Sequence, residues 1–81
     1  MNSNVEVRIK EVMSGVFDID IETINEESSQ DSIEQWDSMK HLDLIVALEE
    51  EFGVDIPIEE VGNMTNFKYI KLIIEEQLAW V

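Results

Sequence analysis

The sequence predicts an all-α fold, a small bundle of three main helices plus one short helix with a long loop after the first. The chain has 81 residues, 44% of them apolar, which is enough for one modest core, so we expect residues 1–81 to form a single domain. Apolar residues recur at helical spacing in three separate segments. The one alternation typical of a strand, from Asp18 to Glu22, has no second strand to pair with.

The first helix is expected from about residue 4 to residue 16. Arg8, Lys10 and Glu11 lie on its polar side, and Gly15 stands near its end, where we expect the chain to turn. The apolar side consists of Val5, Ile9, Val12, Met13, Val16 and Phe17.

Residues 18–37 form a long acidic segment without sustained periodicity, and no Lys or Arg occurs between Lys10 and Lys40. We expect a loop with room for one short helical turn. Loops longer than about 12–15 residues in compact domains are usually functional or disordered. Isoleucines placed among the acids should pin this loop to the core, namely Ile19, Ile21, Ile24 and Ile33.

The second helix should run from about Ser38 to Phe52, where Gly53 stops it. A brief helical turn over 58–61 follows, opened by Pro57 in the favoured first position. Thr65 is the expected N-cap of the last helix. The apolar side of that helix consists of Phe67, Ile70, Ile73, Ile74, Leu78 and Val81.

Two apolar stripes run along the second helix. At about 100° per residue, Leu44, Ile45, Leu48 and Phe52 cluster on one side and form the predicted core stripe. Met39, Leu42 and Val46 fall on a second stripe, displaced by more than about 90°. Either the 18–37 loop covers this second stripe, or the stripe is an exposed docking surface with an acidic rim. The acids available for that rim are Asp43, Glu49, Glu50 and Glu51.

Composition excludes several classes of function. The absence of cysteine excludes disulfides and thiolate metal sites, and a single His excludes a site built from several imidazoles. Nineteen acids against five Lys and Arg give a net charge of −14, which disfavours nucleic acid and anionic membrane as partners. The expected partners are proteins with basic patches, although simple solubility accounts for the charge equally well. No run approaches the roughly 20 apolar residues of a membrane span, and the segment Met1-Asn2-Ser3-Asn4 lacks the basic start and apolar stretch of a signal peptide. We expect a cytoplasmic monomer.

Ser38 is the candidate functional residue. Asp and Ser are both preferred N-caps, so capping alone would account for the Asp37-Ser38 pair. A serine hydroxyl at a helix N-terminus can also carry a phosphodiester, whose charge would meet unpaired backbone N–H groups and the positive end of the helix dipole. The hydroxyl needs no activation by its own chain if a separate enzyme makes the bond.

The stretch from Trp36 to Pro57 resembles the signature of acyl carrier proteins. In that family an Asp-Ser-Leu or Asp-Ser-Met triplet opens the second helix, an acidic run ends it, and an Ile-Pro pair follows. The matching residues here are Trp36-Asp37-Ser38-Met39, Leu42, Ile45, Ala47-Leu48-Glu49-Glu50-Glu51-Phe52 and Asp55-Ile56-Pro57. The triplet alone is a weak signal, whereas the whole stretch is highly specific.

The resemblance implies a four-helix bundle in which Ser38 receives phosphopantetheine from coenzyme A. The thiol of that arm would hold an acyl or aminoacyl group as a thioester, and Asp37 would position the serine for the modifying enzyme. The chain would then be a carrier and not an enzyme. Its partners would be a phosphopantetheinyl transferase, a loading ligase and a downstream acyltransferase or synthase. The implied partner-binding residues are Met39, Leu42, Asp43, Val46, Glu49 and Glu50.

The chain departs from the commonest fatty-acid carriers beside the attachment site. Trp36 occupies a place often held by a small residue, and Lys40 and His41 stand where acidic or small polar residues are common. A Trp at this point is hard to hide in a loop, so we expect Trp36 to pack over the base of the arm or against a partner. His41 is interpreted as a polar surface residue. The changes resemble specialised stand-alone carriers, which serve aminoacyl transfer, surface polysaccharides or secondary metabolites.

Three alternatives compete with the carrier function. A Ser38–His41 hydrolase lacks a Gly-rich elbow, an oxyanion hole and room for a substrate pocket. A calcium loop starting at Asp18 would need Gly at position 23 and Glu at position 29, where the chain has Thr23 and Ser29, so no dedicated metal site is expected. The serious rival is an acidic helical adaptor that binds other proteins and never carries an arm.

Overall fold

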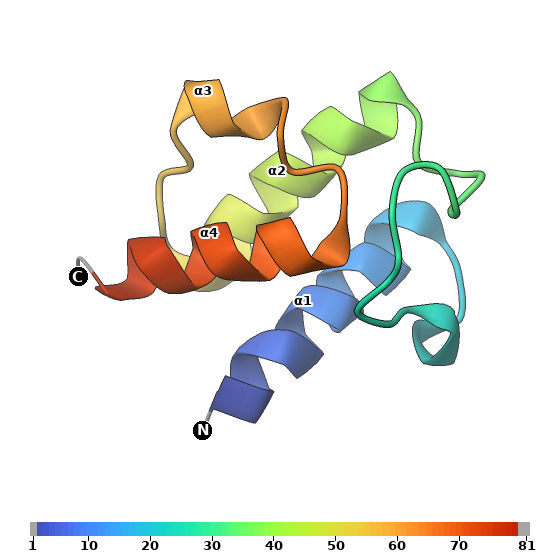
Figure 1. The fold of residues 1–81 in the computed structure, drawn as a ribbon, viewed down its shortest axis with the longest axis horizontal. Helices are drawn as coiled ribbons and strands as arrows, with labels where there is room; N and C mark the ends of the chain where they lie inside the picture. The colour runs from blue at the N-terminus through green and yellow to red at the C-terminus, as the bar shows by residue number, and fades with distance from the viewer. Residues whose placement is uncertain (1, 80–81) are drawn as a thin grey trace.

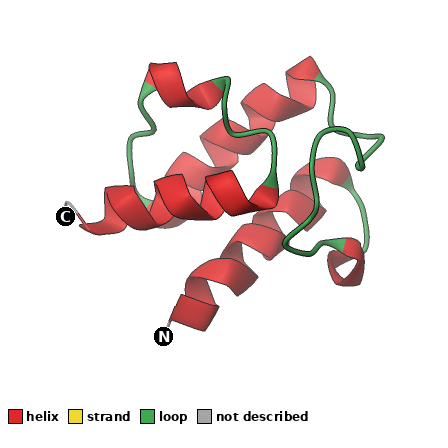
Figure 2. Cartoon of the chain, viewed as in Figure 1, coloured by secondary structure: helices red, strands yellow, loops and turns green. Residues whose placement is uncertain are grey.

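A computed structural model describes residues 2–79 and confirms the predicted helical bundle. Its main helices are α1 (Asn2–Phe17), α2 (Ser38–Phe52) and α4 (Phe67–Ala79), with the short α3 (Ile58–Val61) between the last two (Figures 1 and 2). The long loop holds one 3₁₀ turn, Ile21–Thr23. Over residues 2–79 the only extended pairing is a single bridge between Ser29 and Asn66. The expected apolar residue Val81 lies outside the described residues.

The core lies where α1 packs against both α2 and α4. Its fully buried helical side chains include Ile9, Met13, Phe17, Leu44, Leu48, Phe67, Ile70 and Ile74. Three of the four predicted isoleucines pin the loop to this core, because Ile24 and Ile33 are buried and the partly buried Ile19 packs against the core. Ile21, in the 3₁₀ turn, is not buried. The 18–37 segment is thus a structured loop that contributes apolar side chains to the core.

The end of α1 differs from the prediction. Gly15 lies inside the helix, which continues to Phe17, and the turn falls at Asp18 with a φ of 55°. Aspartate is one of the few residues other than Gly that adopt this left-handed conformation. The hydroxyl of Ser14 donates to the carbonyl of Ile19 at 2.6 Å, and the N–H of Ile19 donates to the carbonyl of Ser14 at 3.2 Å. This local pair of hydrogen bonds holds the turn without glycine.

The start of α4 also differs from the prediction. Asn66, not Thr65, caps the helix, since its side-chain oxygen accepts the N–H of Tyr69 at 2.8 Å. Thr65 is engaged with the long loop instead, where its carbonyl accepts the N–H of Gln30 at 2.8 Å. The N–H of Phe67 donates to the carbonyl of Ser28 at 2.9 Å. These bonds tie the long loop to the start of α4, a contact that periodicity along the chain does not predict.

The α3 segment has only four residues, and a side-chain hydrogen bond from a neighbouring helix helps to hold it in place. Pro57 was predicted to be the first helical residue, but it precedes α3 as the cap residue, with a φ of −58° and a ψ of 136°. The hydroxyl of Tyr69 on α4 donates to Glu60 at 2.6 Å, and this hydrogen bond, together with desolvation and the charge of Glu60, raises the pKa of Tyr69. A side-chain contact thus links α3 to α4.

Gly53 ends α2 in the left-handed region, with a φ of 65°, and its N–H donates to the carbonyl of Glu49. No neighbouring atom lies within 4 Å of where a Cβ would stand at Gly53 or at Gly15. We therefore predict that Gly53→Ala lowers the free energy of unfolding by about 1 kcal/mol through backbone strain alone. Gly15→Ala, inside α1, should raise it by about 0.5 kcal/mol.

Urea unfolding followed by far-ultraviolet circular dichroism measures both variants. Equal stabilities for Gly53→Ala and the wild-type chain would contradict the left-handed end of α2.

Candidate functional site

The start of α2 is set by Asp37, which acts as its N-cap. Asp37 has extended backbone angles, and its Oδ1 accepts the N–H of Lys40 at 2.8 Å. Its carbonyl accepts the N–H of His41 at 2.8 Å. Ser38 is therefore the first residue inside the helix and is exposed. Because the aspartate does the capping, the Ser38 hydroxyl is not needed for it.

The surroundings of Ser38 suit a negatively charged group. The first N–H groups of a helix have no acceptor within the helix. Among the first three N–H groups of α2, only the N–H of Lys40 donates to the Asp37 carboxylate. The N–H groups of Ser38 and Met39 belong to this set, and the helix dipole places partial positive charge there. These N–H groups would hold a phosphate joined to the Ser38 oxygen. The residues therefore fit a phosphodiester at this position.

Trp36 is buried, which corrects the expectation that it is too difficult to hide in a loop. Its exposed fraction is 2%. The indole ring packs on Phe17 at the end of α1, with ring centroids 5.0 Å apart, and its Nε1–H donates to Nδ1 of His41 at 3.0 Å. A side chain engaged on both sides in this way is not available to a partner surface. Trp36 is a core residue that closes the loop onto α1.

His41 is also more than a polar surface residue. Its ring stacks near that of Trp36, with centroids 6.1 Å apart, and its Nε2 lies 2.6 Å from the carbonyl oxygen of Val61. Because Nδ1 accepts the indole proton, the imidazole proton is assigned to Nε2, which donates to Val61. His41 therefore links the long loop, α2 and α3. In the sequence, only the five-residue spacing of Trp36 and His41 could have pointed to this contact. That spacing permits a contact but does not require one.

The second stripe of α2 is exposed. Met39, Leu42 and Val46 have exposed fractions of 78%, 61% and 54%, while the core stripe on the other side is buried. The interpretation in which the long loop covers the stripe is therefore wrong. The loop packs against α1 and the start of α4 instead and leaves this face of α2 open.

The acids beside the stripe have different surroundings. Asp43 and Glu50 are exposed. Glu49 is half-buried and its carboxylate accepts the N–H of Ile56 at 2.9 Å, which fixes the connection after α2. Glu51 forms an ion pair with Arg8 of α1 at 2.9 Å. Asp43 and Glu50 thus supply most of the outward-facing charge beside the stripe.

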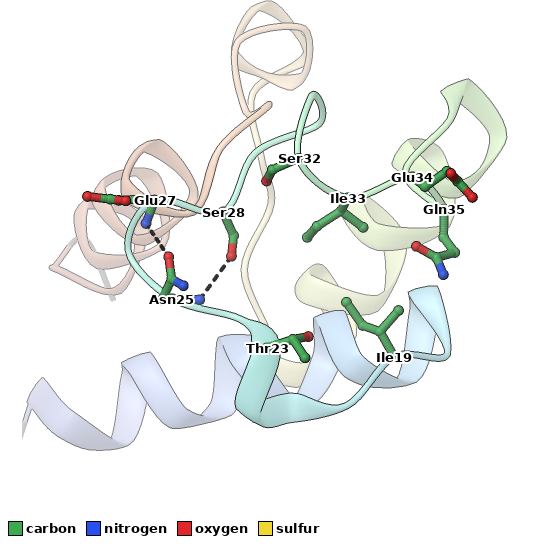
Figure 3. A pocket seen from close by; sticks show the side chains of 9 residues that line it. All are labelled: Ile19, Thr23, Asn25, Glu27, Ser28, Ser32, Ile33, Glu34 and Gln35. Atoms are coloured by element: carbon green, nitrogen blue, oxygen red, sulfur yellow. Dashed lines mark hydrogen bonds between the residues drawn. The ribbon is translucent and has the colours of Figure 1, made fainter.

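A pocket of about 490 Å³ lies within the long loop (Figure 3). Its lining includes Ile19 and Ile33, and the loop is held around it by a hydrogen bond from the N–H of Asn25 to the Ser28 hydroxyl at 2.9 Å. Neither Ser38 nor the exposed stripe lines it. The pocket and the helix start are separate features.

Within residues 2–79, no group of three or more Asp, Glu or His side chains is arranged to hold a metal ion. Asp20, one of the acids that suggested a calcium loop, caps the 3₁₀ turn by accepting the N–H of Glu22 at 3.1 Å. Within the same residues, the helices are too short or too polar to cross a bilayer.

Comparison with known proteins agrees with this arrangement. Residues 7–67 match the family described as "Phosphopantetheine attachment site". An acyl carrier protein from a Picosynechococcus strain is 31% identical over 77 residues, which cover 95% of each chain. The solution structure of a holo acyl carrier protein from Geobacter metallireducens superposes with a TM-score of 0.80 at 28% identity, over 89% of this chain and 83% of that one. A chain in the structure of the ishigamide ketosynthase/chain length factor superposes with a TM-score of 0.73 at 27% identity. The match covers 93% of this chain and 94% of that one.

The two roles of the Asp37-Ser38 pair can be separated by mutation. We predict that Asp37→Ala lowers the free energy of unfolding by about 1 kcal/mol, because the N–H of Lys40 loses its acceptor. Asp37→Asn should retain most of that stability, since Asn caps helices as well as Asp does. Ser38→Ala should change it by less than about 0.5 kcal/mol, because the serine is exposed and does not cap.

Denaturant unfolding of the three variants under identical conditions provides the comparison. A loss for Ser38→Ala as large as that for Asp37→Ala would show that the serine, too, caps the helix.

Proposed function

The chain belongs to the phosphopantetheine attachment family, as an acyl carrier protein by sequence and fold, and we propose that Ser38 is its attachment residue. A carrier of this kind holds acyl or aminoacyl groups as thioesters on the thiol that phosphopantetheine supplies, and presents them to partner enzymes. We further propose that the chain catalyses no reaction itself and that it works in the cytoplasm, where coenzyme A is available to it.

One observation carries the assignment to Ser38. Its side chain is exposed as the first residue of α2, and the adjacent Asp37 already satisfies the cap. In the attachment reaction the Ser38 oxygen would form a bond to phosphorus of coenzyme A, and adenosine 3′,5′-bisphosphate would leave. The serine proton would pass to a base of the modifying enzyme or to water. The backbone N–H groups of Ser38 and Met39 would hold the resulting phosphodiester.

The partner surface proposed for this carrier is the exposed stripe of Met39, Leu42 and Val46 with Asp43 and Glu50 beside it. An apolar centre with a charged rim is the composition of protein interfaces. The net charge of −14 would steer enzymes with basic patches toward it. Glu49 is included as a contributor through its exposed part, although its carboxylate also holds Ile56.

The proposed partners are a phosphopantetheinyl transferase, a loading ligase and a downstream acyltransferase or synthase. The superposition on a chain from a ketosynthase/chain length factor structure supports the last of these classes. An adaptor that never carries an arm would use the same surface, so the modification of Ser38 is what distinguishes the two functions.

Intact-mass measurement tests the attachment directly. Incubation of the purified chain with coenzyme A and a competent phosphopantetheinyl transferase should add one phosphopantetheine per molecule, and Ser38→Ala should abolish the addition. Ser32→Ala, which alters another exposed serine, should leave it unchanged. An unchanged wild-type mass, with the transferase active on another carrier, would favour the adaptor.

The partner surface has its own test in a pair of charge insertions. Val46→Glu should slow modification by the transferase at least about tenfold, equivalent to about 1.4 kcal/mol of lost interaction. Leu72→Glu, at an apolar residue of α4 that is also exposed, should leave the rate unchanged. Both variants should keep the wild-type melting temperature, and unfolding caused by Val46→Glu would show that this residue belongs to the core.

A further inference from the structure

His41, Trp36 and the carbonyl of Val61 close the junction between the start of α2 and the end of α3. This junction, which we call the seam, lies beside Ser38, because residues three apart on a helix share one face. The His41 ring spans it, with Nδ1 accepting from Trp36 at 3.0 Å and Nε2 donating to Val61 at 2.6 Å. Both ring nitrogens are thereby used, and the ring is fixed in one orientation.

The interior behind the seam is filled. Leu44 and Leu48 follow His41 on the same side of α2, and both have an exposed fraction of 0%. Met64, shortly after α3, is also fully buried, and Trp36 covers Phe17. Protein interiors packed in this way admit an added group only if side chains move.

An apolar chain passing from Ser38 through the seam would have to displace the His41 ring. The indole N–H of Trp36 and the carbonyl of Val61 would then lose their partners. Trp36 is buried, so its N–H would be left without water as well, and an unpaired buried polar group is costly. Entry would therefore be opposed by two polar groups at once, in addition to the packing behind them.

We infer that the seam closes the space between α2 and α3 to the cargo of this carrier, and that His41 is the positioning residue that closes it. The inference rests on the proposed function, since it concerns cargo attached through Ser38. It also defines the class of cargo. Short or polar acyl and aminoacyl groups are solvated on the outside, whereas a long alkyl chain would need a partner to cover it.

The experiment uses the full chain loaded at Ser38 with acetyl, hexanoyl or decanoyl phosphopantetheine, transferred from the corresponding acyl-coenzyme A and verified by intact mass. Two quantities are recorded for each form. They are the melting temperature and the ¹H–¹⁵N resonance of the Trp36 indole, identified by its loss in Trp36→Phe. For the wild-type chain the three forms should melt within about 1 °C of one another, with an unchanged indole resonance.

Two variants test the role of His41. His41→Ala opens the seam, so its decanoyl form should melt about 4 °C or more above its acetyl form as the chain enters. His41→Gln keeps a donor and an acceptor at the end of the side chain, and should behave like the wild-type chain.

The outcomes are distinguishable. A wild-type melting temperature that rises with acyl length, together with a shifted Trp36 indole resonance, would overturn the inference, and this result needs no variant to fold. If neither the wild-type chain nor His41→Ala responds to acyl length, the role given to His41 is wrong. Failure of the mass to increase at all would instead overturn the proposed attachment at Ser38.

Discussion

The hydrogen bond between the Lys40 N–H and the Asp37 carboxylate fixes the residue at which α2 begins, and the site depends on that position. With Asp37 as the cap, Ser38 becomes the first helical residue, exposed and beside unpaired N–H groups. The rotation of the helix is set by its core stripe, because Leu44 and Leu48 are buried. Met39, Leu42 and Val46 therefore turn outward on the other side. The capping interaction thus places the attachment residue, and the buried stripe places the surface proposed to bind partners.

The acidic character of the chain has two roles in the structure. Some carboxylates serve the fold, since Glu49 holds the N–H of Ile56 and Glu51 pairs with Arg8. Others, among them Asp43 and Glu50, are exposed beside the apolar stripe. Surface ion pairs contribute little to stability. The net charge of −14 keeps the chain soluble, and the proposed recognition of basic partners would use the same charge.

Sequence reasoning succeeded where a local signal determines the structure. The limits of α2 were predicted correctly because Asp37 and Gly53 act within a few residues of the positions that they terminate. The end of α1, at Phe17, lies one residue beyond the predicted limit, because the turn falls at Asp18 and not at Gly15. Asn66 rather than Thr65 caps α4, since Thr65 pairs with Gln30 far along the chain. The burial of Trp36 was missed for the same reason, because it depends on Phe17 and on the fold of the loop. Contacts between distant segments leave no periodic pattern to detect.

The central claim is that the exposed hydroxyl of Ser38 carries the arm in the working protein. Tandem mass spectrometry of the chain isolated from the cell that makes it tests this claim most directly. The account predicts that the peptide containing Ser38 is found with phosphopantetheine and that this serine is the modified residue. A chain that is recovered wholly unmodified alongside carriers that do bear the arm, or one modified at a different serine, would contradict it.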